Sequence, residues 1–358
     1  MAKPSLKSPL SFRGKRSRQG FSLVELLVSV AILVIILGVI FAMTSQTARV
    51  YKSTGGQMES FRAARNAFET ITRNLSLATL NNYYDYVDAT GKTRAQVIKA
   101  NVTADINAFN PTTYGRVSDL HFVSGWYNVS SGLYSKQVTH SIFFQAPLGF
   151  TTTATLSSME NLLSACGYYI EYKEDADSPT FITSPKIYRY RLMEFIQPSE
   201  DLSVYTKTDT TWFTIPLGAT TPPVHQIAPN IIALLILPRS SSADSGALTT
   251  NDPIGKEITN FQYNTRTNTA VTIHNQLPPI VEVIMVAIDE ASAVRITPNT
   301  SAPPTVIQTA ITTNTRFQSV AKLETDLTDL QIDLSAKHIT YRVFRTLVPL
   351  RNSKWSSN

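Results

Sequence analysis

A run of 18 residues without a charged side chain, residues 26–43, constrains this chain more than any other feature. Only Ser29 and Gly38 interrupt its apolar character. As an α-helix the run is roughly 27 Å long, close to the ~30 Å hydrocarbon core of a bilayer. Its apolar residues are consecutive, and the run is longer than the roughly 4 to 8 residues of a buried strand. The sequence therefore predicts a membrane-spanning helix over residues 21–48.

The basic residues that precede this run predict its orientation. The first 20 residues contain six cations and no acid: Lys3, Lys7, Arg13, Lys15, Arg16 and Arg18. They account for the whole formal charge of +6, because the other 26 basic residues are balanced by 26 acidic ones. The positive-inside bias places residues 1–20 in the cytoplasm and the rest of the chain across the membrane. A neutral body also gives no sign of a nucleic-acid partner.

A cleaved secretory signal peptide is the main alternative to a retained anchor. The apolar region of such a peptide usually has about 7 to 15 residues and ends at a cleavage site with small side chains. The run in this chain is longer, and Ala42, Met43 and Thr44 make a poor cleavage site. We therefore expect the helix to remain in the mature protein.

Glu25 stands at the start of the predicted span and is not explained by simple anchoring. A carboxylate at the centre of a membrane helix costs about 2.5 to 3.5 kcal/mol, and less near its end. Glu25 either has a partner inside the membrane or stays hydrated at the interface. The residue types alone leave both interpretations open.

Residues 18–28 resemble the N-terminal signature of type IV prepilins and type II secretion pseudopilins. The resemblance implies that a membrane-embedded prepilin peptidase removes residues 1–20 by cutting between Gly20 and Phe21. It also implies methylation of the new Phe21 amine. In the family, the glutamate that matches Glu25 pairs with the N-terminal amine of a neighbouring subunit. The implied processing residues are Gly20 and Phe21, and the implied assembly residues are Phe21 and Glu25.

Apolar residues at helical spacing continue beyond the span and predict an amphipathic extension over residues 49–82. The stripe consists of Met58, Phe61, Phe68, Ile71 and Leu75. We expect the adjacent glycines at 55 and 56 to bend or break the helix, since together they cost about 2 kcal/mol relative to alanine. Asn81 and Asn82 are the predicted end of the pattern.

Residues 83–358 predict a β-rich extracytoplasmic body, which gives an α+β fold with a mainly antiparallel sheet and long loops. The predicted strands are 119–123, 138–145, 168–172, 187–196, 212–215, 231–237, 258–263, 270–274, 280–288 and 339–348. Helices are predicted at 157–165 and 317–334. Segments 197–226, 239–256 and 296–315 are rich in Ser, Thr, Pro, Asn and Asp and predict loops.

Three further segments are similar to a narrower set of pilin-like proteins. These segments are 65–71, 277–286 and 341–345. They resemble the larger minor pseudopilins of the J type and the Verru_Chthon cassette group. The resemblance implies a long N-terminal helix packed on antiparallel strands.

The sequence predicts no catalytic residue, cofactor or metal site. Residues 90–93 read Thr-Gly-Lys-Thr, but a phosphate-binding loop needs a glycine where this chain has Tyr86. Cys166 stands alone, so no internal disulfide can form, and we expect it to be a small buried residue. Asp175 and Asp177 lack the glycine and glutamate of a calcium loop.

The histidines and the tyrosine clusters are expected to be structural. The histidines lie in separate segments, at His121, His140, His225, His274 and His338. The tyrosines at 83, 84 and 86, and at 188 and 190, are expected to pack on sheets.

These patterns predict a minor pilin-like or pseudopilin subunit in the bacterial inner membrane, with its body in the periplasm. It would join a type II secretion-like or type IV pilus-like filament through its N-terminal helix, and it would not be an enzyme. Its predicted partners are prepilin peptidase, other pilin-like subunits and the inner membrane. The alternatives are a membrane-tethered binding protein that does not polymerise and a tethered hydrolase.

Overall fold

The computed structural model describes residues 22–100, 109–126, 136–174, 187–207, 209–240, 258, 261–267, 273–297 and 300–354. The chain forms two compact units, Met1–Thr54 and Gly55–Asn358. An N-terminal apolar helix precedes antiparallel sheets, so the predicted α+β class is confirmed.

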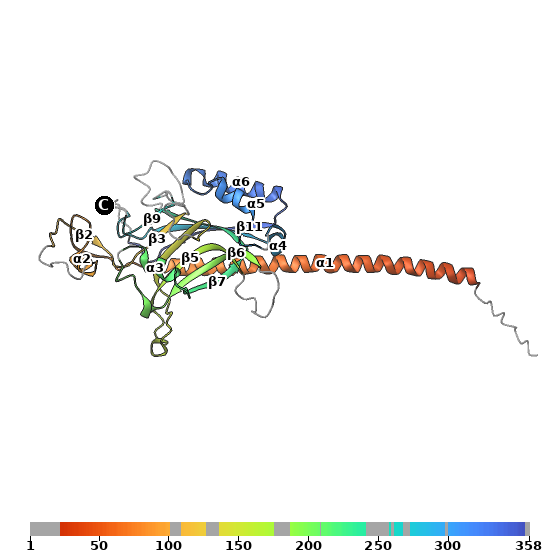
Figure 1. Cartoon of the computed structure of the whole chain (residues 1–358), viewed down its shortest axis with the longest axis horizontal. Helices are drawn as coiled ribbons and strands as arrows, with labels where there is room; N and C mark the ends of the chain where they lie inside the picture. Colours follow the sequence, from red (N-terminus) through yellow and green to blue (C-terminus); the bar gives the residue numbers. More distant parts are fainter. Residues whose placement is uncertain are drawn as a thin grey trace, which may run out of the picture. The chain divides into compact units, whose positions relative to one another are not determined.

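Helix α1 covers Leu23–Ser76 without interruption (Figure 1). The predicted break at Gly55 and Gly56 is therefore wrong. Tertiary packing commonly outweighs intrinsic helix propensity, and the residues that follow the glycines are packed in the core of the second unit. The helix also ends earlier than expected, because residues 77–82 are not helical.

The larger sheet has six antiparallel strands in the order β7-β6-β5-β4-β3-β9. Its long central pair, β5 and β6, is continuous from Ala165 opposite Gln197 to Glu174 opposite Tyr188. The strands are β3 (Val123–Trp126), β4 (His140–Pro147), β5 (Leu163–Glu174), β6 (Tyr188–Gln197), β7 (Val224–Pro229) and β9 (Tyr263–Asn264).

A second sheet has three antiparallel strands, with β10 (Ile280–Ile288) between β8 (Ile231–Arg239) and β11 (Tyr341–Pro349). Every residue of β8 is buried. Strand β8 lies against β3, β4, β5 and β6 of the larger sheet, which explains why its sequence is continuously apolar. The two sheets therefore enclose the main core.

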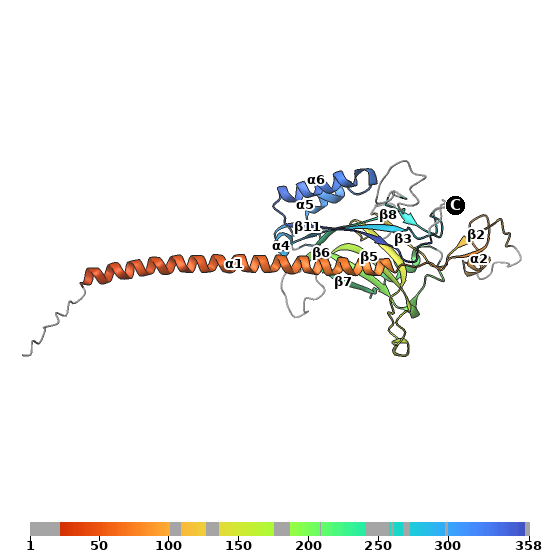
Figure 2. The same ribbon diagram turned by 180° about the vertical axis from the view of Figure 1, so that it is seen from behind.

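The second half of α1 contributes its apolar stripe to this core, where it runs along the strands (Figure 2). Phe68, Ile71 and Leu75 are buried, as predicted, and Phe61 is partly buried. Met58 was predicted to share the stripe, but its side chain is 67% exposed. The stripe thus begins to be covered only after Met58.

Helix α6 (Leu323–Ala336) lies beside the short helix α5 (Thr305–Gln308), next to β11 in both ribbon views (Figures 1 and 2). Its four leucines at helical spacing are buried, which confirms the helix predicted there. Residues 317–322 precede α6 as a turn and a 3₁₀ segment, Val320–Lys322. The predicted loop at 296–315 is wrong in part, because it contains α5 and a π-helical turn at Thr309–Thr313.

Two predictions of element type are wrong. Residues 212–215, predicted as a strand, belong to helix α3 (Thr211–Leu217). The predicted loop 197–226 therefore contains a helix, and it also contains the start of β7. A helix buries Trp212, Phe213 and Leu217 together and leaves Ile215 58% exposed. Residues 157–165, predicted as a helix, form turns and the start of β5, because Met159 is 51% exposed and supplies no buried helical face.

Several smaller elements complete the second unit. The two-stranded sheet β1–β2 is formed by β1 (Tyr83–Val87) and β2 (Thr113–Val117), and helix α2 (Arg94–Ala100) lies between them in the sequence. Helix α4 (Glu290–Ile296) is capped by Asp289, whose side chain accepts from the Ser292 N–H. The strand predicted at 119–123 starts only at Val123. In the segment predicted as a strand at 258–263, residues 259 and 260 lie outside the described residues, and of the others only Tyr263 belongs to a strand, β9. Residues 241–256 and 270–272 lie outside the described residues.

Candidate functional site

The first part of α1 presents an uncovered apolar surface. Residues 23–48 form the one helix, among the described residues, that is long and apolar enough to cross a membrane. Every side chain in this segment is exposed, including Leu27, Ile36 and Phe41. A surface of this size and composition requires lipid or other apolar helices around it.

Glu25 lies in the first turn of α1, and its backbone is held by two serines. The Glu25 N–H donates to Oγ of Ser22 at 3.3 Å, and the Ser29 hydroxyl donates to the Glu25 carbonyl oxygen at 2.7 Å. The carboxylate itself is exposed and has no hydrogen-bond partner among the described residues. A negative charge at a helix N-terminus is favoured by the helix dipole, typically by about 0.3 to 1 kcal/mol.

Glu25 is the only charged residue between positions 22 and 48. Its carboxylate can therefore accept hydrogen bonds from a charged amine that reaches this end of the helix. The other predicted processing and assembly residues, Gly20 and Phe21, lie outside the described residues. Cleavage between them and methylation of Phe21 stay predictions.

The Thr-Gly-Lys-Thr segment at 90–93 builds a turn and a helix cap. Oδ1 of Asp88 accepts from the N–H groups of Thr90 at 2.8 Å and Lys92 at 3.0 Å. Thr93 and Gln96 then exchange side-chain to backbone hydrogen bonds at the start of α2, the arrangement of a capping box. The backbone N–H groups and the threonine hydroxyls of this segment thus have local structural partners.

Two of the five histidines are buried and neutral. Burial lowers the pKa of His121 to about 3 and that of His140 to about 4. Each ring nitrogen has a partner: His140, for example, accepts the Ile236 N–H at Nδ1 and lies 2.8 Å from the Phe317 carbonyl oxygen at Nε2. These two histidines are structural, as expected.

Cys166 is fully buried, which confirms its expected place, and burial raises the pKa of its thiol. Asp175 and Asp177 lie outside the described residues. Within the described ranges, no group of three or more His, Cys, Asp or Glu side chains is arranged to hold a metal ion.

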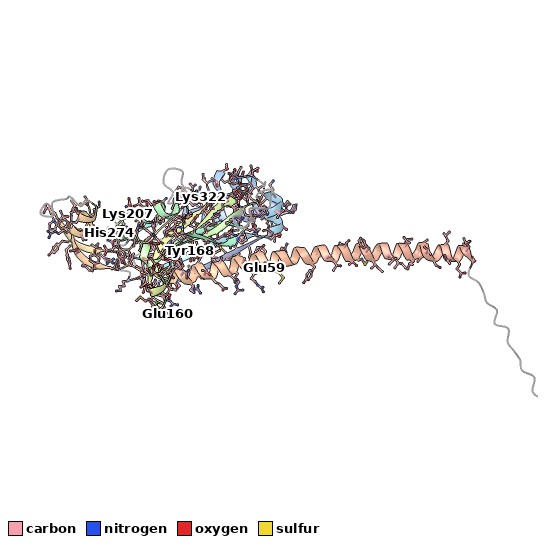
Figure 3. The ribbon with its side chains drawn as sticks, turned by 60° about the horizontal axis from the view of Figure 1, so that its bottom comes forward. Glu59, Glu160, Tyr168, Lys207, His274 and Lys322 are labelled. Carbon is pink, nitrogen blue, oxygen red and sulfur yellow. The ribbon has the colours of Figure 1, made fainter. Side chains whose placement is uncertain are left out.

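A cavity of about 740 Å³ in the second unit was not expected from the sequence. It lies beside the β1–β2 sheet and includes Lys207 and His274, whose side chains Figure 3 labels close to one another. Its lining comes from four separate parts of the chain: residues 87–92 and 96; residues 112, 113 and 115–119; residues 204, 205, 207 and 209; and residues 266, 267, 274 and 275. No short motif in the sequence could have marked it.

Comparison with known proteins gives one match. The family model described as the prokaryotic N-terminal methylation motif matches residues 15–41. Searches of curated proteins and of solved structures found no match. The matched segment contains Gly20, Phe21 and Glu25. It supports a type IV pilin-like protein that is processed by a prepilin peptidase, and together with the apolar helix it is consistent with a single-pass membrane anchor.

Proposed function

We propose that this chain is a minor pilin-like or pseudopilin subunit that assembles through α1 into a type II secretion-like or type IV pilus-like filament complex. One observation carries the proposal: a lone carboxylate, Glu25, stands in an exposed apolar helix that lies within a methylation motif. The role is structural rather than enzymatic. The large extracytoplasmic body suits a minor subunit of the J type or the Verru_Chthon group better than a repetitive major subunit.

The chemistry of cleavage explains why Glu25 is retained. Cutting after Gly20 would make Phe21 the first residue of the chain, with a positively charged amine that can pair with Glu25, the fifth residue, of a neighbouring copy. Inside an apolar bundle, an unpaired carboxylate is costly, whereas a carboxylate paired with an amine is tolerated and fixes the relative position of the helices. The charge pair would fix the register between the helices of neighbouring subunits.

The apolar side chains of the rest of this segment would determine what packs around it. The apolar residues of 23–48 are exposed on all sides, so neighbouring helices or lipid can surround the segment completely. In lipid, helices associate through close packing and a few polar contacts rather than through the hydrophobic effect. Glu25 is the strongest such polar contact available in the segment.

The first test is the intact mass and N-terminal residue of the protein extracted from membranes. The proposal expects a chain that starts at methylated Phe21. Retention of Met1, or a cut beyond Met43, would overturn it. A Gly20 variant with a bulky side chain serves as the uncleaved reference, because prepilin processing needs an accessible backbone at that position.

The second test separates assembly from processing. Chemical crosslinking in native envelopes is compared for the wild type, Glu25→Gln and the matched control Ser29→Ala on the same helix. The proposal expects crosslinks to pilin-like neighbours in the wild type and in Ser29→Ala, and their loss in Glu25→Gln. Normal processing with unchanged crosslinks in Glu25→Gln would favour the tethered binding protein that does not polymerise.

A further inference from the structure

The cavity beside the β1–β2 sheet, here called the β1–β2 cavity, has the size of an organic ligand site. Its volume of about 740 Å³ lies within the range of roughly 300 to 1,000 Å³ typical of ligand pockets. All of its lining belongs to the second unit. What it can bind follows from its charges, its unpaired donor and its hydroxyl groups.

Cations outnumber acids in the lining. The charged groups are Lys92, Arg116, Lys207 and Arg266 against Asp88, Asp119 and Asp209. The acids already accept hydrogen bonds within the fold: Asp88 from Thr90 and Lys92, Asp119 from Asn81, and Asp209 from Thr211. Their lone pairs are therefore partly used, whereas Lys92, Lys207 and Arg116 can still donate to a ligand.

Arg266 shows how the cavity retains positive charge. Its guanidinium donates to the backbone carbonyls of Lys207 at 2.7 Å and Val204 at 3.1 Å, and also to that of Asp119. Carbonyl oxygens satisfy its donors without neutralising it. Burial lowers the pKa of Arg266 to about 10, so it remains charged at neutral pH.

Arg116 supplies the donor that lacks a partner. Its Nη1 atom is buried and has no hydrogen-bond acceptor among the described residues. Its backbone is fixed by the Asn275 side-chain amide, which donates to the Arg116 carbonyl at 2.8 Å. Buried polar groups are nearly always paired, and a guanidinium is matched best by the two oxygens of a carboxylate, sulfate or phosphate. Arg116 also lines the cavity, so an oxyanion there would give this donor an acceptor once the guanidinium turns toward the cavity.

Aromatic rings accompany Arg116 on the same face of the β1–β2 sheet. Arg116 is directly opposite Tyr84, and Tyr86 is opposite Tyr114. The Tyr114 ring centroid lies 5.9 Å from that of Tyr84 and 5.1 Å from that of Tyr86. Tyr84 and Tyr86 thus pack against Tyr114 across the β1–β2 sheet, as expected, although the three tyrosines are 59–63% exposed. These three rings do not line the cavity, whereas Tyr205 does, and its 40% exposed ring can stack on a ligand ring there.

Seven of the other lining residues offer hydroxyl or amide groups. These are Thr90, Gln96, Thr112, Thr113, Ser118, Thr267 and Asn275. Such groups both donate and accept hydrogen bonds, which suits a ligand rich in hydroxyl groups. A nucleotide base would instead need an apolar slot, and the apolar lining consists of small or scattered residues such as Val87, Ala89 and Val117.

We propose that the β1–β2 cavity binds an acidic saccharide, with its carboxylate or sulfate on Arg116 and a sugar ring against Tyr205. Lys92 and Lys207 add charge attraction, and the threonines bind the ring hydroxyls. The site does not depend on filament assembly, since every residue of it belongs to one copy of the second unit.

The experiment uses the full-length protein in detergent micelles and isothermal titration calorimetry. The acidic probes are a galacturonate trisaccharide and a sulfated disaccharide. A neutral trisaccharide, inorganic phosphate and a ten-nucleotide single-stranded DNA are the comparison probes. We expect at least one acidic saccharide to bind more tightly than all three comparison probes. Raising the salt concentration should weaken its binding, because the cations are partly exposed to solvent.

Arg116→Ala should weaken binding of the acidic saccharide by about tenfold or more, because it removes the bidentate donor. Arg94→Ala is the matched control, since Arg94 is an exposed arginine of α2 that does not line the cavity. If Arg116→Ala does not fold, Arg116→Lys and Lys92→Ala test the same point. The proposal is overturned if neither acidic saccharide binds, if any comparison probe binds as tightly, or if the arginine variants bind like the wild type.

Discussion

The indole N–H of Trp212 donates a hydrogen bond to Nδ1 of His121 at 2.9 Å, and both side chains are buried. The other ring nitrogen of His121 lies 2.9 Å from Oδ1 of Asn264. Because Nδ1 accepts a hydrogen bond from the Trp212 N–H, the neutral ring carries its own proton on Nε2, and this N–H donates a hydrogen bond to Oδ1 of Asn264. One histidine therefore joins helix α3 to the edge strand β9.

This bond predicts a cost for removing the indole. Trp212→Phe leaves Nδ1 of His121 buried without a donor and also leaves a small void. We expect a loss of about 2 to 4 kcal/mol in the free energy of unfolding. Denaturant unfolding of the full-length protein measures it. Trp126→Phe is the control, because Trp126 is only partly buried. Equal losses in the two variants would show that the His121 contact adds no specific stability.

Trp212 also shows where the sequence was insufficient. The run Trp212 to Ile215 fits a short strand as well as a helix, and only the buried surface against Phe143 and Phe195 decides for the helix. Strand β10 was predicted with its observed bounds, because a long apolar run between turn residues has one sensible interpretation. Short apolar runs are ambiguous, so their structure depends on tertiary contacts that the sequence does not display.

The same limit explains why the candidate sites were not equally predictable. Glu25 could be identified because a charge in an apolar run is a local signal. Arg116, Lys207 and Arg266 are distant in the sequence and meet only after the β1–β2 sheet and its surrounding loops have folded. Neither β1 nor β2 was predicted, so their shared cavity could not be anticipated.

Acid should destabilise the fold through its neutral histidines. The folded-state pKa of His140 is about 4, below its unfolded value of about 6.5, because the buried ring resists protonation. Above pH 6.5 neither state is charged, so His140 causes no pH dependence. Below it the unfolded state binds a proton that the folded state does not, and stability falls. Between pH 6.5 and 5 the loss is roughly 2 kcal/mol for such a histidine.

The measurement is the free energy of unfolding from pH 5 to 8 for the wild type and His140→Gln. Glutamine keeps one donor and one acceptor but does not titrate in this range. We expect the variant to have a shallower decline toward pH 5. His225→Gln is the control, because His225 is exposed. An unchanged slope in His140→Gln would contradict the burial argument.

A buried carboxylate links the three strands of the smaller sheet, because Glu282 of β10 pairs with Arg239 of β8 and Arg345 of β11. Glu282 of β10 is 1% exposed and accepts from Nε of Arg239 at 2.7 Å, with Arg345 of β11 on its other oxygen. Glu282→Ala would leave the buried Arg239 without its carboxylate. We expect a loss of about 3 to 5 kcal/mol in the free energy of unfolding.

Glu324 is the matched control for Glu282, since it also pairs with Arg345, at 2.8 Å, but its side chain is 71% exposed. Glu324→Ala should cost at most about 1 kcal/mol, as is usual for exposed ion pairs. Denaturant unfolding compares the two variants directly. A small effect of Glu282→Ala would mean that water or another group replaces the carboxylate.

The unbroken helix at Gly55 and Gly56 predicts that alanine stabilises it. A Cβ atom added at either position meets no atom within 4 Å, and neither glycine has a positive φ. Gly55→Ala with Gly56→Ala should therefore stabilise this part of α1 by about 2 kcal/mol in total, since each alanine loses less backbone entropy on forming the helix. Amide hydrogen exchange at residues 50–60 measures the change, and slower exchange is expected.

Gly167→Ala is the opposite control, because its added Cβ would lie 2.1 Å from the Phe143 ring and should destabilise β5. Faster exchange in the double alanine variant would show that the glycines serve a bend in the working protein that outweighs their helical cost.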